Sequence, residues 1–177
     1  MPRVEGDGKD TRREDMTRYF TTYWTKGPWE RLAYEPVHHT ASNEFAKRGV
    51  QVGDHLYVVH YERREVFLGA RLVVKSVVTR AEAAAEFGVE EDEVWDARDH
   101  VLADPEQVQR LDPNRVIPHR VLRGLTFLRA DGTETGVKFD ADGAADQQTF
   151  RSVRELSPSS AEALDALIEW DGAPRAS

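Results

Sequence analysis

Two strand-like apolar runs joined by a short charged turn constrain the fold of this chain more than any other feature. In residues 55–61 and 65–78, apolar side chains alternate with others, as in strands that turn one face to a core. The charged tripeptide at 62–64 separates them. We therefore predict a β-hairpin, around which the rest of the chain must be arranged.

Further strands are predicted on both sides of this hairpin. Residues 19–24 are aromatic and β-branched, a composition that favours a strand. The apolar runs 121–128 and 135–139 flank an Asp-Gly turn at 131–132, and this pattern predicts a second hairpin because glycine supplies the positive φ of a tight turn. A last strand is expected at 150–156.

Two helices have recognisable start signals. Thr79 and Glu82 have the spacing of a capping box, with Gly88 placed to end a short helix. Ser157 precedes a proline, which is typical of an N-cap followed by the first helical residue. Apolar residues beyond it share one helical face, so a helix is expected to run to about Trp170.

Length and composition indicate one compact domain. The chain has 177 residues and 40% hydrophobic content. Residues 16–170 are assigned to the domain, and disordered tails are expected at 1–15 and 171–177. The absence of cysteine excludes disulfides and thiolate metal sites within this sequence. Residues 1–10 lack the apolar centre of a signal peptide and no apolar run has membrane length, so we expect neither a signal peptide nor a membrane span. We expect a soluble cytoplasmic protein that does not bind a membrane.

The negative charge is concentrated in one segment. The formal net charge is −8, yet residues 82–114 hold eleven Asp and Glu against two Arg. Residues 16–75 hold nine Lys and Arg against six Asp and Glu. The segment 82–114 is interpreted as an acidic insert of short helices and loops without a firm pattern. The remaining, mildly basic body can still face a phosphate backbone.

Three parts of the chain occur in an order with a known parallel. They are an aromatic strand ending in Tyr23–Lys26 with Ser-Asn at 42–43, a Gly-Asp turn at 53–54 leading into the central hairpin, and Ser152–Ser157 before a helix. Together they resemble the PUA-like superfamily, which includes EVE, ASCH and YTH domains, over about 16–170. The resemblance implies an α+β fold, a PUA-like mixed β-barrel with short flanking helices.

The resemblance also implies a function. Domains of this kind often read nucleic acid, taking a modified or flipped base into a pocket of aromatic and polar side chains. We therefore expect a DNA or RNA partner and no cofactor, metal or catalytic residue. Whether a nuclease or another protein acts beside the domain stays open.

Two sets of candidate site residues follow. Tryptophans could stack on a base, and Asn43 could read its edge, whereas the alternatives are a core position for each tryptophan and helix capping for Ser42. The expected base-binding residues are Trp24, Trp29, Ser42, Asn43, His39 and His60. The expected phosphate-binding residues are Lys26, Lys47, Arg48, Arg63 and Arg151, for which solvated surface charge is the alternative.

Enzymatic function is the less favoured interpretation. The chain has no nucleophile elbow, phosphate-binding glycine loop, zinc-protease motif or dinucleotide fingerprint. One alternative is a small ASCH-like hydrolase acting on a nucleotide or modified nucleoside, with Lys26 and either Glu44 or Asp54 activating water. A protein-interaction module that uses the acidic segment is another.

Overall fold

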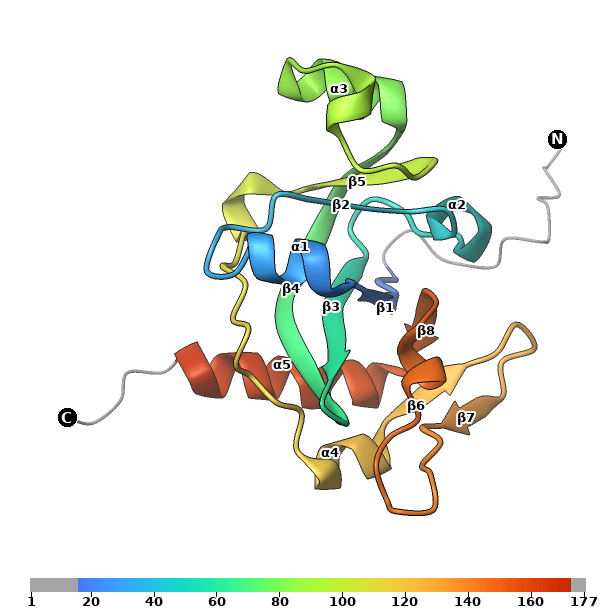
Figure 1. The fold of residues 1–177 in the computed structure, drawn as a ribbon. Helices are drawn as coiled ribbons and strands as arrows, with labels where there is room; N and C mark the ends of the chain where they lie inside the picture. The colour runs from blue at the N-terminus through green and yellow to red at the C-terminus, as the bar shows by residue number, and fades with distance from the viewer. Residues whose placement is uncertain (1–15, 173–177) are drawn as a thin grey trace, which may run out of the picture.

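A computed structural model describes residues 16–172 (Figure 1). The expected tail at 1–15 lies outside the described residues, as do residues 173–177. The strands are β1 (Tyr19–Tyr23), β2 (His39–Ser42), β3 (His55–Glu62), β4 (Glu65–Thr79), β5 (Asp99–Ala103), β6 (Thr126–Leu128), β7 (Glu134–Gly136) and β8 (Arg154–Leu156). The α-helices are α1 (Lys26–Arg31), α2 (Phe45–Arg48), α3 (Arg80–Phe87), α4 (His119–Gly124) and α5 (Pro158–Gly172). Short 3-10 helices are η1 (Glu91–Glu93), η2 (Pro105–Gln107) and η3 (Gln147–Phe150).

The strands form one sheet in the order β2-β5-β4-β3-β1-β8-β6-β7. β1 runs parallel to β3, with Tyr23 opposite Val59, and the other neighbouring pairs are antiparallel. Because parallel strands run in the same direction, the residues after Tyr23 meet the last residues of β3 at one end of the sheet.

The sheet is not closed into a barrel. Its edge strands β2 and β7 have four and three residues and pair on one side only within residues 16–172. Closure requires hydrogen bonds that join the two edges of a sheet, and these strands stand at opposite ends of the strand order. The expected closed barrel is therefore wrong, whereas the α+β class with short helices is confirmed.

The central hairpin is confirmed as β3 and β4. Its two-residue turn holds Arg63 and Arg64 at φ 53° and 65°. Positive φ at both central residues is typical of the tight turns that match the twist of hairpins, but glycine and asparagine usually occupy them. Upstream, Asp54 is buried, and its carboxylate accepts hydrogen bonds from the backbone amides of Arg18 and Gln51 at 3.1 and 2.8 Å. The Gly-Asp pair at 53–54 is thus a structural turn, as predicted.

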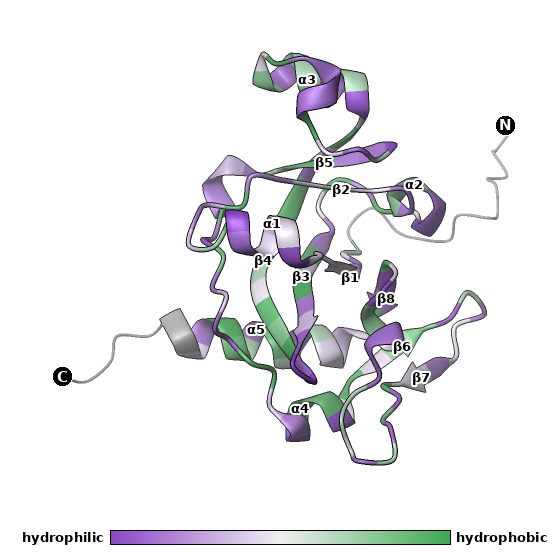
Figure 2. Ribbon diagram, in the orientation of Figure 1, coloured by the Kyte–Doolittle hydropathy of each residue, from purple (hydrophilic) through white to green (hydrophobic). Residues whose placement is uncertain are grey.

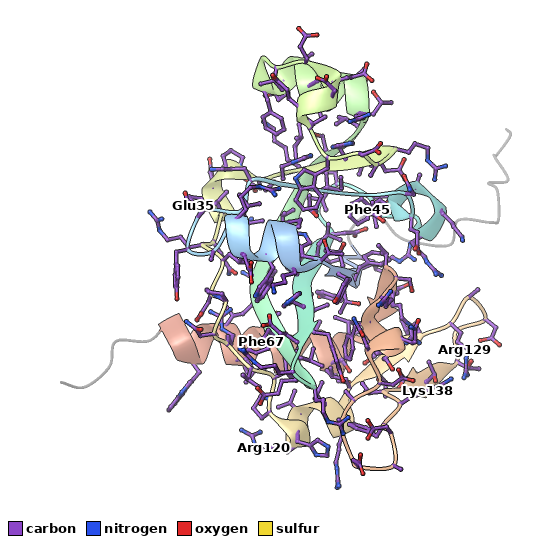
Figure 3. The ribbon with its side chains drawn as sticks, in the orientation of Figure 1. Glu35, Phe45, Phe67, Arg120, Arg129 and Lys138 are labelled. Carbon is purple, nitrogen blue, oxygen red and sulfur yellow. The ribbon has the colours of Figure 1, made fainter. Side chains whose placement is uncertain are left out.

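Two hydrophobic clusters lie on the two faces of β3 and β4. Trp29 of α1 and Phe45 of α2 belong to one cluster, and Phe150 and Leu164 belong to the other, with Leu164 supplied by α5. α1 and α5 correspondingly lie on opposite sides of the central strands (Figure 1). Figure 2 shows these strands as largely hydrophobic, with a hydrophilic hairpin tip, and Figure 3 labels Phe45 on α2.

The acidic segment contains a strand that the sequence analysis did not predict. β5 lies between β2 and β4, so this segment supplies an inner strand of the sheet. β2 was not predicted either, and within residues 16–172 it pairs with β5 alone. The helix α3 begins with the predicted capping box, in which Thr79 Oγ1 accepts from the Glu82 amide and Glu82 accepts from the Thr79 amide. It ends at Gly88, whose φ is 70°.

Two other elements differ from the sequence prediction. Residues 119–124 form α4, so the second hairpin is confirmed only for β6 and β7, with Gly132 at φ 89° in the turn. The strand expected at 150–156 is confined to β8, because 147–150 form η3. The helix after Ser157 is confirmed as α5.

A partly buried polar contact joins α5 to the sheet. Asp165 Oδ1 accepts a hydrogen bond from the Tyr57 hydroxyl at 2.8 Å and from Arg71 Nη1 at 2.9 Å. Burial, and then the Asp165 hydrogen bond, raises the pKa of Tyr57. Tyr57 therefore acts here as a neutral hydrogen-bond donor.

Candidate functional site

A pocket of about 440 Å³ opens where β1 and β3 end. Its walls come from the end of β1, the start of α1, the end of β3 and the residue after η3. The lining residues are Tyr23, Thr25, Lys26, His60, Tyr61, Glu62 and Arg151. Three of these, Lys26, His60 and Arg151, belong to the predicted site, and the parallel pairing of β1 with β3 is what brings Lys26 close to His60.

A larger groove lies elsewhere, between α5 and residues 112–121. Its volume is about 860 Å³, and Trp170 and Arg120 are among its lining residues; Arg120 is labelled on α4 in Figure 3. None of the predicted site residues lines it. We therefore take the smaller pocket as the candidate site, because it gathers predicted residues with both aromatic and charged groups.

His60 forms the inner wall of the pocket. Its side chain is 3% exposed, with Nδ1 2.8 Å from the carbonyl oxygen of Trp24 and Nε2 3.2 Å from Oε1 of Glu62. The ring lies between Tyr23 and Trp29, at centroid distances of 6.0 and 4.8 Å and interplanar angles of 27° and 19°. Stacking and hydrogen bonds together fix the orientation of the imidazole.

Trp29 supports the pocket without lining it. Its side chain is 4% exposed and packs against His60 from α1. The ring also lies over Gly69 of β4, where an added Cβ would be 2.7 Å from Trp29 and 2.3 Å from Leu111. The prediction that Trp29 offers an open stacking face is wrong, because Gly69 lets the ring settle into the core.

Trp24 is also a core residue. The side chain is 1% exposed, its Nε1 donates to Thr40 Oγ1 at 2.8 Å, and its ring meets that of Trp95 edge to face at 5.1 Å. A ring enclosed in this way has no free face for a base. The prediction of Trp24 as a stacking residue is therefore wrong, although its carbonyl oxygen holds His60.

Ser42, the last residue of β2, and Asn43, in the connection from β2 to α2, lie outside the pocket. Ser42 Oγ accepts from the Glu44 amide at 3.0 Å, but the N-cap of α2 is Glu44 and has no side-chain capping bond, so Ser42 is not the helix cap. Asn43 Oδ1 accepts from the Arg98 amide at 2.7 Å and so links this connection to the start of β5. Both side chains are engaged in hydrogen bonds within the protein. The structure does not place them where they could read the edge of a base bound in the pocket.

His39 likewise belongs to another cluster. Its Nε2 is 2.7 Å from Nδ1 of His100, and its ring contacts Phe87 and Trp95 edge to face. Burial, and then the neighbouring His100, lowers the pKa of His39 from 6.5 to about 4. His39 is therefore a neutral ring that packs against the acidic segment and does not line the pocket.

Lys26 and Arg151 supply positive charge to the pocket. Lys26 is 71% exposed and has a long 3.9 Å contact with Glu30. Arg151 is exposed, and its guanidinium has no hydrogen bond or ion pair within residues 16–172. Solvent screening makes the Lys26 pair weak. Both cations are therefore available to an anionic ligand.

The remaining predicted cations lie outside this lining. Arg63 is 80% exposed at the hairpin tip, with Nη1 3.7 Å from Oε2 of Glu62, so it borders the pocket. Lys47 and Arg48 are on α2, where Arg48 pairs with Glu44 at 3.4 Å. These two are not brought together with Lys26 and Arg151.

Comparison with known proteins assigns no family. No family model matches the sequence, and no curated protein matches it. A solved structure of a hypothetical protein from Leishmania major is similar at 16% identity and a TM-score of 0.46, over 90% of this chain and 99% of that one.

The sequence analysis missed four pocket residues, Tyr23, Thr25, Tyr61 and Glu62. The Tyr23 hydroxyl accepts from Gln147 Nε2 at 3.2 Å, and the Tyr61 hydroxyl donates to the carbonyl oxygen of Ala145 at 2.9 Å. Thr25 precedes α1 without a side-chain capping bond. All four lie at the ends of strands or just after them. This position predicts that they share a pocket only once β1 is known to run parallel to β3.

The arrangement does not support the hydrolase pairs considered from the sequence. Asp54 precedes β3, whereas Lys26 follows β1, so about 15 Å of parallel strand separates them. Glu44 lies on the α2 side, next to Arg48. Across residues 16–172, no three His, Asp or Glu side chains are grouped as metal ligands. No helix in the same range has the length and apolar surface needed to cross a bilayer.

Proposed function

We propose that this protein is a non-enzymatic nucleic-acid-binding domain of the PUA-like type, which takes one flipped or modified base into the pocket at the ends of β1 and β3. The observation that carries this proposal is the composition of that pocket. Aromatic side chains, a fixed polar wall and two available cations line one cavity. A nucleotide offers the matching groups, namely a flat ring, polar edges and a phosphate.

The size and walls of the pocket suit a base. About 440 Å³ falls within the usual range of small-ligand sites. Tyr23 and Tyr61 are partly exposed, and each is held through its hydroxyl, so a base can pack on them without disordering the pocket. Base stacking on an aromatic ring contributes about 1–3 kcal/mol.

The distribution of charge also favours this function. Lys26 and Arg151 line the pocket, and Arg63 stands at its rim. Much of the acidic segment is in α3 and η1, which Figure 1 shows at the end of the molecule away from the β3–β4 hairpin tip. An approaching phosphate backbone therefore meets a locally basic surface despite the net charge of −8.

A binding assay tests the proposal directly. Fluorescence anisotropy would be measured with single-stranded DNA and RNA oligonucleotides, plain and base-modified, at low salt and over a salt series. We expect binding, and we expect Lys26→Ala and Arg151→Ala each to weaken it and to reduce the salt slope by about one phosphate contact.

The matched controls are Lys47→Ala and Arg48→Ala, which remove charge from α2. They should change binding much less than the pocket variants. Absence of binding to every oligonucleotide at low salt would overturn the proposal. Equal losses from α2 and pocket variants would reduce it to nonspecific phosphate attraction.

A hydrolase remains the second candidate because Lys26 and the carboxylate of Glu62 line the same pocket. Product analysis after incubation with nucleotides and modified nucleosides separates the two functions. Turnover that disappears in Lys26→Ala would replace the binding proposal with an enzymatic one.

A further inference from the structure

We propose that Glu62 makes the pocket selective for bases that carry an exocyclic amino group, namely adenine, cytosine and guanine, over uracil and thymine. This inference rests on the proposed base-binding function and names the ligand class that the pocket admits. It depends on the one carboxylate among the lining residues and on how that carboxylate is held.

His60 fixes the position of the carboxylate. Nδ1 of His60 must donate a proton to the Trp24 carbonyl oxygen, because a carbonyl can only accept. Nε2 of the same ring is 3.2 Å from Oε1 of Glu62. Oε1 is therefore engaged by His60.

The other oxygen of Glu62 is left as an acceptor. Oε2 is 3.7 Å from Arg63 Nη1, longer than a hydrogen bond. In the ionised carboxylate both lone pairs of Oε2 accept, and in a carboxyl protonated at Oε1 the oxygen Oε2 is still an acceptor. Glu62 is 31% exposed, which lets a ligand reach it while water access is reduced.

A fixed acceptor distinguishes bases by their edges. The amino groups of cytosine and adenine donate hydrogen bonds, and guanine carries an amino group as well. Thymine and uracil present the O4 acceptor where cytosine has its amino group, and their one donor on that edge, N3–H, lies between O4 and O2, which repel an approaching carboxylate oxygen. Lys26 and Arg151 are donors and are better matched to phosphate oxygens.

Oligonucleotides with a single base would test this selectivity. The probes are short single-stranded DNAs in which one central nucleotide, A, C, G, T or U, is flanked by abasic positions, measured by fluorescence anisotropy at low salt. We expect the probes with A, C or G to bind about tenfold more tightly than those with T or U. Glu62→Gln should bring the two groups within about twofold, because an amide also donates.

Glu65→Gln is the matched control. Glu65 faces Glu62 across the hairpin turn, is exposed and does not line the pocket. The substitution Glu65→Gln therefore removes the same charge close to the pocket and should leave the base preference unchanged. Glu62→Asp keeps the charge with a shorter reach and should also weaken the preference. Thermal melts of Glu62→Gln, Glu62→Asp and Glu65→Gln would show whether a change in base preference comes from lost recognition or from lost folding.

The outcomes distinguish the two proposals. Failure of every probe to bind would remove the proposed function and this inference with it. Binding without a base preference, a preference for T or U, or a preference that survives Glu62→Gln would overturn the role of Glu62 alone. A preference lost equally in Glu65→Gln would also overturn it, since the effect would then be one of net charge.

Discussion

The rings of His60 and Trp29 stack with their centroids 4.8 Å apart and their planes 19° from parallel. This pair joins the candidate site to the core, because one ring lines the pocket and the other is enclosed behind it. The contact depends on Gly69, which leaves room for Trp29 above β4.

Gly69→Ala should therefore affect both stability and binding. The added methyl group would be 2.3 Å from Leu111 and 2.7 Å from Trp29, so the core must shift. We expect a loss of about 1–3 kcal/mol in the free energy of unfolding, measured by urea denaturation, together with weaker oligonucleotide binding. Gly124→Ala is the control, because a Cβ there meets nothing within 4 Å. Wild-type stability in Gly69→Ala would show that the ring is not confined as described.

Asn43→Ala should separate structural from ligand-contacting residues. The side chain accepts a hydrogen bond from the Arg98 amide and lies outside the pocket. We expect about 1 kcal/mol lower stability in urea unfolding and unchanged oligonucleotide affinity. Lys26→Ala should show the opposite pattern, with unchanged stability and weaker binding. Specific loss of binding in Asn43→Ala would restore this residue to the site.

Replacing Arg63-Arg64 by Asn-Gly should raise the stability of the protein and lower its affinity for oligonucleotides. Both arginines have positive φ, which asparagine and glycine adopt more readily. The replacement also removes exposed contacts of Arg64 with Asp140 and Asp142 at 3.1 and 3.7 Å, which contribute little. We expect the free energy of unfolding to rise by up to about 1 kcal/mol. Oligonucleotide affinity should fall if Arg63 contacts phosphate, and unchanged affinity would remove Arg63 from the binding surface.

Stability should decrease in mild acid. The pKa of His39 is lowered from 6.5 to about 4, so the unfolded chain binds more protons between these values. The contribution is complete above about pH 6.5 and is lost as the pH falls toward 4, by about 3 kcal/mol at most. Burial lowers the pKa of His55 and His100 in the same direction.

Urea unfolding at pH 7.5, 6.0 and 5.0 measures this loss. His39→Gln should flatten the pH dependence in part, since its amide nitrogen can take the place of Nε2 beside His100 but does not titrate. The pH dependence of stability that remains in this variant would come from His55 and His100. Stability that is constant from pH 7.5 to 5.0 would contradict the buried, neutral state of the pair.

The locally encoded elements could be predicted from the sequence. The β3–β4 hairpin, the capping box at Thr79 and the helix after Ser157 depend on short-range patterns, and the structure confirms all three. The strands β2 and β5 were missed because His39–Ser42 and Asp99–Ala103 are short, with four and five residues, and show no alternation of apolar and polar residues. Their strand state comes from pairing with each other and with β4, which no local pattern reveals.

The site was predictable only in part for the same reason. Lys26, His60 and Arg151 were identified, and the structure brings them to one pocket. Trp24 and Trp29 were considered as stacking residues or as core residues, and the structure places both in the core. Residue type alone does not report which face of an element is buried. Glu62 was assigned to a turn, and its importance emerges only from its contact with His60.

The position of β5 limits how the acidic charge can be changed. Since β5 stands between β2 and β4, deleting residues 82–114 would remove the partner of β2 and expose one side of β4. A minimal version of this domain therefore cannot be obtained by deleting the whole acidic segment, because β5 must be kept. Substitutions at exposed positions of α3 and η1 would alter the charge and leave the hydrogen bonds of β5 intact.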